Sequence, residues 1–135
     1  MERLAVLVVE DELNVQETLA AVLTLEGFKA HRASSVDEAL AILDHERVDA
    51  VSLDVRMPDP KGQGRDGLTL LKHLRSVPQY ADIPVLLFTG VELKPDEQRL
   101  AGDCHATVFY KPQLYGTVIN ELNRLLAKRP PTPAA

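Results

Sequence analysis

Five residues of this sequence have the types and the spacing for chemistry on a phosphoryl group, and each lies at the end of a short apolar run. They are Glu10, Asp11, Asp54, Thr89 and Lys111. Clustered carboxylates repel one another, so Mg²⁺, which suits one or two carboxylates plus water, is a natural partner. A carboxylate beside such an ion can attack phosphorus, while an ammonium and a hydroxyl stabilise phosphoryl oxygens. The set predicts a phosphoryl-transfer site that uses Mg²⁺, or Mn²⁺ in its place, if the fold brings these residues together.

The apolar runs alternate with helical patterns five times, which is typical of an α/β domain with a parallel sheet. Strands are expected over residues 4–9, 28–33, 49–54, 83–89 and 106–110. Helices are expected over 13–26, after the N-cap Ser35, and over 67–77, 95–102 and 114–126. Crossovers of this length join parallel strands and are right-handed. The prediction is a three-layer, doubly wound sheet of five parallel strands, which binds ligands beyond the carboxyl ends of its strands.

Local signals support the expected helix ends. Gly27 follows the first helix as a C-cap glycine would, and Ser35 with Glu38 has the spacing of a capping box. Pro95 opens the fourth helix, and acidic residues follow it near the positive end of the helix dipole.

The composition indicates one ordinary globular domain. The chain has 135 residues, of which 45% are hydrophobic and 26% charged. We expect a domain over 1–127 and a Pro-rich disordered tail or truncated linker over 128–135. A net charge of −5 argues against direct binding of nucleic acid. The apolar runs are too short for a membrane span, and no secretory signal opens the chain, so a cytoplasmic location is predicted.

The other residues that could bind metals or react are assigned to structure or solvent. Cys104 is the single cysteine, which excludes an intramolecular disulfide and favours packing over nucleophilic chemistry. The four histidines lack the spacing of a zinc site: His31, His45, His73 and His105. Three further acidic residues are interpreted as cap, solvent or turn residues: Glu12, Asp49 and Asp59.

Five motifs in fixed order resemble the receiver domain of bacterial two-component response regulators. They are VLVVEDE, DAVSLDVRMP, DGLTLLKHLR, IPVLLFTG and FYKP, spread over residues 4–126. The resemblance implies a flavodoxin-like (βα)5 fold and a signalling domain that catalyses only its own aspartyl phosphorylation and dephosphorylation. A sensor histidine kinase or a phosphotransfer protein would donate the phosphoryl group. A downstream protein, an output domain missing from this chain, or a second copy in a phosphorylation-dependent homodimer would receive the signal.

The resemblance also implies a role for each acidic residue. Asp54 would accept the phosphoryl group from a phosphohistidine. Asp11, Asp54 and the backbone carbonyl of Arg56 would bind Mg²⁺ directly, and Glu10 would bind it through water.

Two further residues would serve the phosphate. Lys111 would pair with the Asp54 carboxylate or its phosphate, and Thr89 would follow the phosphate and shift the face of the fourth helix. The peptide bond between Lys111 and Pro112 is expected to be cis. The apolar residues near this face are as compatible with core packing as with an output surface: Val85, Leu93, Leu100 and Val118.

Three features depart from the family pattern. Residues 59–65 contain an insertion of about five residues, which is expected to be a mobile surface loop that gates the site or contacts a partner. Val108 stands where the family usually carries a switch aromatic. Val91 and Arg56 flank the phosphate position, so an unusual phosphate lifetime is expected.

Three other functions are compatible with parts of the sequence. A phosphorylation-independent binding or dimerisation module would keep the fold alone, which Val108 and the long loop favour. A Mg²⁺-dependent phosphatase for external substrates would need an aspartate where Arg56 stands. A nucleotide-binding loop is suggested by Gly62-x-Gly64-x-x-Gly67, but that fingerprint belongs directly after the first strand. The complete acidic set favours the phosphoacceptor hypothesis.

Overall fold

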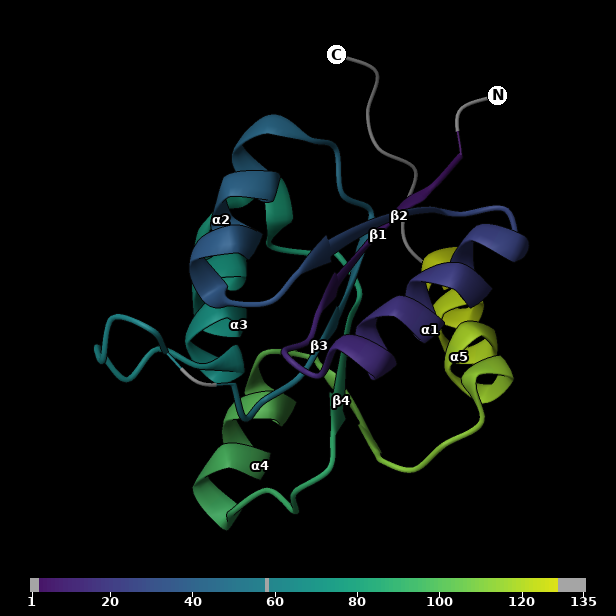
Figure 1. Cartoon of the computed structure of the whole chain (residues 1–135). Helices are drawn as coiled ribbons and strands as arrows, with labels where there is room; N and C mark the ends of the chain where they lie inside the picture. The colour runs from purple at the N-terminus through teal and green to yellow at the C-terminus, as the bar shows by residue number, and fades with distance from the viewer. Residues whose placement is uncertain (1–2, 58, 129–135) are drawn as a thin grey trace.

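The computed structural model describes residues 3–57 and 59–128, in which strands and helices alternate along the chain (Figure 1). The strands are β1 (Ala5–Val9), β2 (Lys29–Ala33), β3 (Ala50–Leu53), β4 (Val85–Thr89) and β5 (Thr107–Tyr110). The helices are α1 (Leu13–Leu25), α2 (Val36–His45), α3 (Gly67–Ser76), α4 (Pro95–Asp103) and α5 (Tyr115–Lys128), with a short 3-10 helix η1 (Pro78–Tyr80). All strand pairs are parallel, in the order β2-β1-β3-β4-β5. This is the flavodoxin-like order, so the predicted fold class is confirmed.

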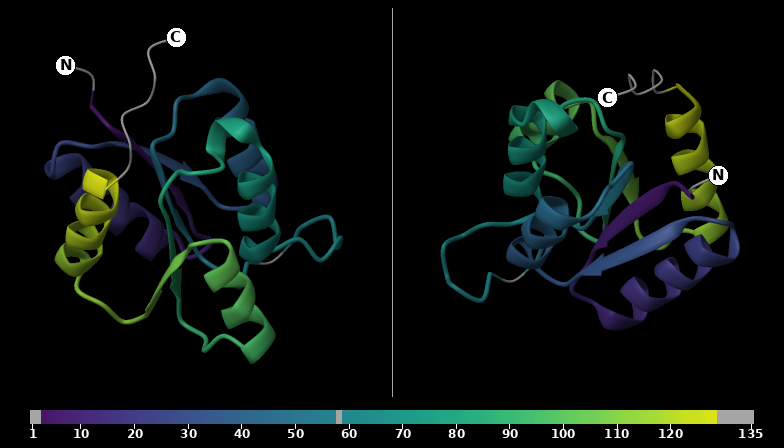
Figure 2. Two further views of the ribbon diagram at one scale, coloured as in Figure 1. Left: turned by 180° about the vertical axis from the view of Figure 1, so that it is seen from behind. Right: turned by 90° about the horizontal axis from the view of Figure 1, so that it is seen from above.

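Two layers of helices cover the sheet, with α1 and α5 on one face and α2, α3 and α4 on the other (Figure 2). Alternate residues of the central strand β1 point to opposite faces. Val6 and Val8 pack with α1 and α5, whereas Leu7 and Val9 pack with α2 and α3. Because both faces are buried, the central strands are continuous apolar runs in the sequence.

The element boundaries differ from the predicted ones by at most two residues. Gly27 has φ +94°, as a C-cap glycine requires. The Ser35 hydroxyl caps α2 by accepting the N–H of Glu38 at 3.2 Å, but it donates to the Glu38 carboxylate, so the contact is not the expected reciprocal capping box. η1 was not predicted. α5 includes Lys128, which was assigned to the tail, and the rest of that tail, 129–135, lies outside the described residues.

Asp49 is a buried structural residue, so its interpretation as a solvent-exposed residue is wrong. Only 6% of it is exposed. Its carboxylate accepts the N–H of Ala5 at 2.8 Å and the Nε–H of Arg47 at 3.1 Å. Asp49 thereby joins the start of β3 to the start of β1.

The apolar residues near the predicted output face belong to the core. Val85 and Leu93 are buried in one core cluster, and the partly buried Leu100 packs against that cluster. Val118 is buried in the second cluster, on the opposite face of the sheet. Cys104 also packs against the core, as expected for a structural cysteine. Among the described residues, no helix has the length and apolar character to cross a membrane.

Candidate phosphorylation site

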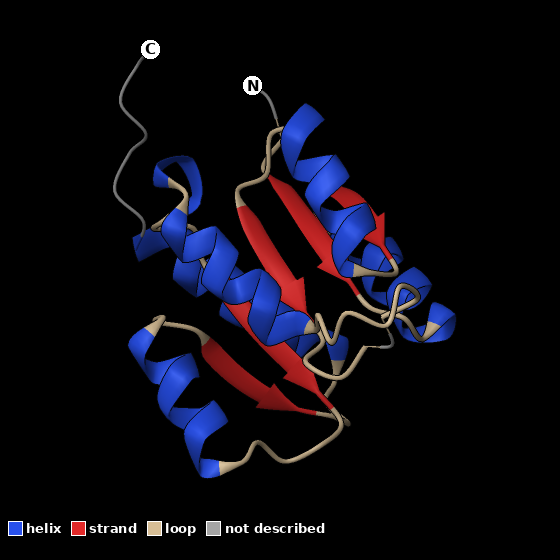
Figure 3. Cartoon of the chain, turned by 90° about the vertical axis from the view of Figure 1, so that its left-hand side faces the viewer, coloured by secondary structure: helices blue, strands red, loops and turns tan. Residues whose placement is uncertain are grey.

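Backbone hydrogen bonds extend the sheet by one residue beyond three strands and hold the site residues at its carboxyl edge. The N–H of Glu10 donates to the last carbonyl of β2, and the N–H of Asp54 donates to the last carbonyl of β1, both at 2.9 Å. The N–H of Lys111 donates to the last carbonyl of β4 at 2.8 Å. Figure 3 shows the strands pointing toward this common edge. The parallel sheet therefore gathers these residues from distant parts of the chain.

Glu10, Asp11 and Asp54 form an acidic centre at this edge. Carboxylate oxygens of the three residues lie within 4.8 Å of one another. Glu10 and Asp54 are only 3% and 5% exposed, and Asp11 is half-buried. Because Mg²⁺ prefers carboxylate oxygens and retains several waters, this donor set fits the ion that the sequence predicts.

The ammonium of Lys111 neutralises part of this negative charge. Its Nζ lies 2.6 Å from Oε1 of Glu10, 3.5 Å from Oδ2 of Asp54 and 5.5 Å from the centre of the Phe88 ring. Burial opposes the charged form of Lys111, but the hydrogen bond with Glu10 and the charge of Asp54 raise its pKa overall. Lys111 is therefore cationic at neutral pH.

The Glu10 carboxyl holds its proton unusually tightly. Burial and a hydrogen bond with Asp54 raise the pKa of Glu10 from 4.5 to about 7, and Lys111 opposes this rise without cancelling it. Two neighbouring carboxylates in a closed site favour a shared proton unless a cation neutralises them. The acidic centre is therefore an environment that a divalent cation would stabilise.

Thr89 is fully buried at the end of β4, and its hydroxyl bonds within its own loop. Its Oγ1 accepts the N–H of Val91 and donates to the Val91 carbonyl, both at 3.3 Å. Thr89 therefore lies at the predicted edge, with its hydroxyl held by Val91. The peptide bond between Lys111 and Pro112 is cis, as expected.

Arg56 makes a contact that the sequence did not predict. Its N–H donates to Oδ1 of Asp54 at 3.3 Å. Its guanidinium donates to both carboxylate oxygens of Glu97, in the first turn of α4, with two bonds of 2.7 Å. Glu97 was recognised only as an acidic residue favourable near a helix N-terminus. No signal in the sequence connects two residues that are 41 positions apart.

The inserted loop is folded around the carboxylate of Asp59. Three backbone N–H groups donate to this carboxylate, each at 3.0 Å: those of Lys61, Gln63 and Arg65. Arg65 also reaches Asp37 of α2 at 2.7 Å. The assignment of Asp59 to a turn is confirmed. Because these loop N–H groups already bind a carboxylate, the structure gives no support to a phosphate-cradling glycine loop.

The loop forms one wall of a cavity of about 520 Å³ beside the acidic centre. The cavity is lined by Asp11, Arg56, Met57, Asp59, Gly64, Arg65 and Asp66. The insertion therefore shapes the approach to the predicted phosphorylation site.

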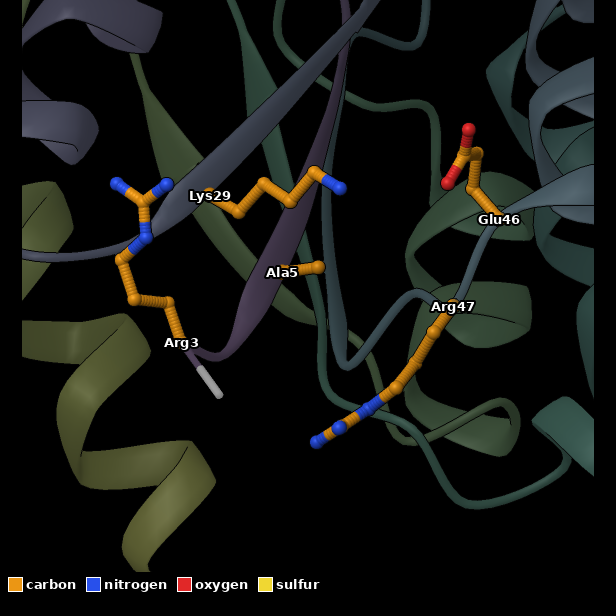
Figure 4. A pocket seen from close by; sticks show the side chains of 5 residues that line it. All are labelled: Arg3, Ala5, Lys29, Glu46 and Arg47. Carbon is orange, nitrogen blue, oxygen red and sulfur yellow. The ribbon is translucent and has the colours of Figure 1, made fainter. Parts of the chain in front are cut away.

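A second cavity, of about 360 Å³, lies at the opposite, amino-terminal edge of the sheet (Figure 4). It is lined by Arg3, Ala5, Lys29, Glu46 and Arg47. Ala5 and Lys29 are the first residues of β1 and β2. Because this cavity contains none of the predicted site residues, the chemistry is assigned to the carboxyl edge.

Known proteins with similar sequences point to one family. The family model for the response regulator receiver domain matches residues 6–119. Response regulator MprA of Mycolicibacterium vanbaalenii is 33% identical over 132 residues, which cover 96% of this chain and 53% of MprA. Regulatory protein AtoC of Escherichia coli is 36% identical over 85 residues, covering 63% of this chain and 17% of AtoC. This chain spans about half or less of the length of these relatives.

Solved structures agree with the sequence comparison. Chemotaxis protein CheY4 of Vibrio cholerae matches with a TM-score of 0.80 at 27% identity, covering 92% of this chain and 99% of CheY4. Response regulator TrrA of Thermotoga maritima matches with a TM-score of 0.75 at 24% identity, covering 90% of this chain and 98% of TrrA, and supports the fold. The family match includes β2 to β5, all of β1 except Ala5, and the acidic centre. The chain therefore belongs to the response regulator receiver domain family.

Proposed function

We propose that this domain accepts a phosphoryl group on Asp54 from the phosphohistidine of a sensor kinase or phosphotransfer protein. The observation that carries the proposal is the position of Asp54. Its buried carboxylate lies 3.5 Å from the Lys111 ammonium and within 4.8 Å of the Glu10 and Asp11 oxygens. Lys111 binds Glu10 closely, at 2.6 Å, but lies 3.5 Å from Oδ2 of Asp54, so Asp54 is the better nucleophile in this site.

The surrounding groups orient the two oxygens of Asp54 differently. The Arg56 N–H contacts Oδ1, whereas Oδ2 faces Lys111. In the transfer, an Asp54 oxygen forms a bond to phosphorus while the bond from phosphorus to the donor's imidazole nitrogen breaks. The imidazole takes up a proton from solvent, and Lys111 stabilises the phosphoryl oxygens that arrive.

Asp11, Asp54 and the backbone carbonyl of Arg56 are the residues that we expect to hold Mg²⁺, with Glu10 contacting it through water. When bound, the ion would neutralise negative charge on the phosphoryl oxygens. The close spacing of the three carboxylates supports this assignment, and Mn²⁺ would fit the same oxygen donors.

Exposed apolar side chains beyond three strand ends support a protein as the phosphodonor. Leu13, Val91 and Leu114 are 57%, 49% and 79% exposed, and they lie in sequence just after Asp11, Thr89 and Lys111, respectively. Exposed apolar groups at a reactive edge suit contact with another protein. A downstream protein, an output domain or a second copy of this chain would then read the phosphorylated state.

The proposal is tested by incubating the domain with acetyl phosphate and Mg²⁺ and measuring its intact mass. We expect a gain of one phosphoryl group that is absent in Asp54→Asn. Asp44→Asn is the matched control, because Asp44 is an exposed carboxylate at the end of α2, and it should be labelled like the unmodified domain. Equal labelling of Asp54→Asn would contradict the proposal.

A phosphorylation-independent binding or dimerisation module is the second candidate. Two observations favour it: the Thr89 hydroxyl is held by Val91, and the aliphatic Val108 packs against the core without a hydroxyl-bearing ring. This candidate predicts an amide NMR spectrum that does not change on addition of beryllofluoride and Mg²⁺. Beryllofluoride is a suitable probe because TrrA has been solved in complex with Mg²⁺-BeF. Widespread changes would favour the phosphoacceptor function.

A further inference from the structure

We propose that Arg56 is a phosphate-responsive link that holds α4 through Glu97 before phosphorylation and releases it afterwards. The inference rests on the proposed phosphorylation of Asp54. It assigns a coupling role to the side chain of Arg56, which the sequence connected only with the lifetime of the phosphate.

The contacts of Arg56 join the phosphoacceptor to α4 in one residue. Its backbone N–H donates to Asp54 at 3.3 Å, and its guanidinium makes two 2.7 Å bonds to Glu97. The Glu97 side chain is 11% exposed and that of Arg56 is 35% exposed. A two-bond arginine–carboxylate pair fixes geometry more strongly than a single contact. The position of α4 is therefore tied directly to the loop that follows Asp54.

The Arg56–Glu97 contact matters because α4 itself buries few apolar side chains. Ala101 is the only buried residue among those of the described helix. Glu97 also accepts the N–H of Lys94 at 2.9 Å, so the same carboxylate caps the helix and receives Arg56. An element with few buried contacts opens at low free-energy cost. Loss of the two Arg56–Glu97 hydrogen bonds would therefore loosen the first turn of α4.

Phosphorylation creates a competitor for the Arg56 guanidinium. A phosphoryl group brings roughly two negative charges and several strong acceptor oxygens, whereas Glu97 offers one carboxylate. The hydrogen bonds with Glu97 are the main cause that raises the pKa of Arg56, and the charge of Asp54 adds to this rise. Because one guanidinium cannot bind both anions through the same two N–H groups, we expect it to turn from Glu97 to the phosphoryl oxygens. Thr89, whose hydroxyl is bound by Val91, is not required for this route.

The test compares three variants by the amide NMR spectrum of α4 with beryllofluoride and Mg²⁺ as the phosphoryl mimic. In the unmodified domain, amides of Asp96–Asp103 should shift on addition of the mimic. In Arg56→Gln at full occupancy by the mimic, these shifts should fall by more than about half. The reason is that the two bonds to Glu97 are absent both with and without the mimic. In Glu97→Gln, the α4 amides should resemble the mimic-bound spectrum before any addition, and the mimic should bind roughly tenfold more tightly, since Arg56 is no longer retained.

Arg65→Gln is the matched control. Arg65 borders the same cavity and pairs with a carboxylate, Asp37, at 2.7 Å, but that carboxylate belongs to α2. Its α4 response should equal that of the unmodified domain. Intact mass after acetyl phosphate treatment is measured in parallel. Equal α4 shifts in all variants, with the mass gain retained, would overturn the link and leave Asp54 phosphorylation standing. Absence of the mass gain in the unmodified domain would overturn both.

Discussion

Gly67 packs directly against the backbone of Asp54, with no room for a side chain between them. A Cβ at position 67 would overlap the Asp54 carbonyl oxygen, and it would also approach Cα of Val55 at 2.9 Å. The N–H of Gly67 donates to the Val55 carbonyl at 3.1 Å. The first residue of α3 is therefore fixed against the loop that presents the predicted phosphoacceptor.

Gly67→Ala should destabilise the domain and displace Asp54. Overpacking against backbone costs about 1–3 kcal/mol, and urea unfolding would measure the loss. Gly116→Ala is the matched control, because a Cβ there meets nothing within 4 Å. Gly116 is the exposed second residue of α5, so this change should alter the free energy of unfolding by less than about 0.5 kcal/mol. Equal effects of the two substitutions would contradict the close packing at Gly67.

Lys111→Met should slow phosphorylation of Asp54 by roughly tenfold or more, because the charge that stabilises the phosphoryl oxygens is lost. The rate of mass gain with acetyl phosphate and Mg²⁺ measures the effect. Lys72→Met removes an exposed lysine of α3 and should leave the rate unchanged. A similar rate in both variants would show that Lys111 does not serve the transfer.

The stability of the domain without divalent cations should fall as the pH rises from about 4.5 to about 7. The raised pKa of Glu10 means that the folded protein binds this proton more tightly than the unfolded chain, which retains the ordinary value of 4.5. The resulting stabilisation is complete below pH 4.5 and is lost as the pH passes through about 7. We expect a change on the order of 1–3 kcal/mol.

Urea unfolding in a chelator across this pH range would measure the Glu10 contribution. Glu10→Gln should remove most of the pH dependence. Glu12→Gln changes a neighbouring side chain that is 66% exposed and should preserve the dependence. If the free energy of unfolding depends on pH in the same way in Glu10→Gln and in the unmodified domain, Glu10 does not cause the pH dependence.

Asp59→Ala should unfold the inserted loop while leaving the domain folded. Three loop N–H groups donate hydrogen bonds to the Asp59 carboxylate and would lose this acceptor. Amide hydrogen exchange in the loop should therefore accelerate. Gln63→Ala keeps the backbone N–H that Asp59 binds and should exchange at the original rate. Unchanged protection in Asp59→Ala would mean that other contacts, such as Arg65 with Asp37, hold the loop.

The sequence was sufficient to place Glu10, Asp11, Asp54 and Lys111 at one edge, because strand ends are marked by an abrupt change from apolar to polar residues. Parallel topology then forces those ends together. The role of Asp49 was missed because its partner is the backbone N–H of Ala5. Every residue type except proline would supply this donor at position 5, so the sequence carries no signal of the contact.

The contact between Arg56 and Glu97 was missed for a different reason. Each residue alone suits a solvated surface, and their encounter depends on how α4 is placed on the sheet. The conformation of the inserted loop could not be predicted from the sequence either. Its glycines and proline indicate a turn, but they do not identify Asp59 as the acceptor of the loop's hydrogen bonds.

The ion pair between Glu10 and Lys111 joins residues 101 positions apart, and this separation has a consequence for biosynthesis. Both Glu10 and Asp54 leave the ribosome well before β5 is made. Burying two carboxylates without their cation is unfavourable, so we expect this edge of the nascent domain to stay open and hydrated during translation. The emergence of Lys111 would then allow the last strand to close it, which makes completion of the site a late event of cotranslational folding.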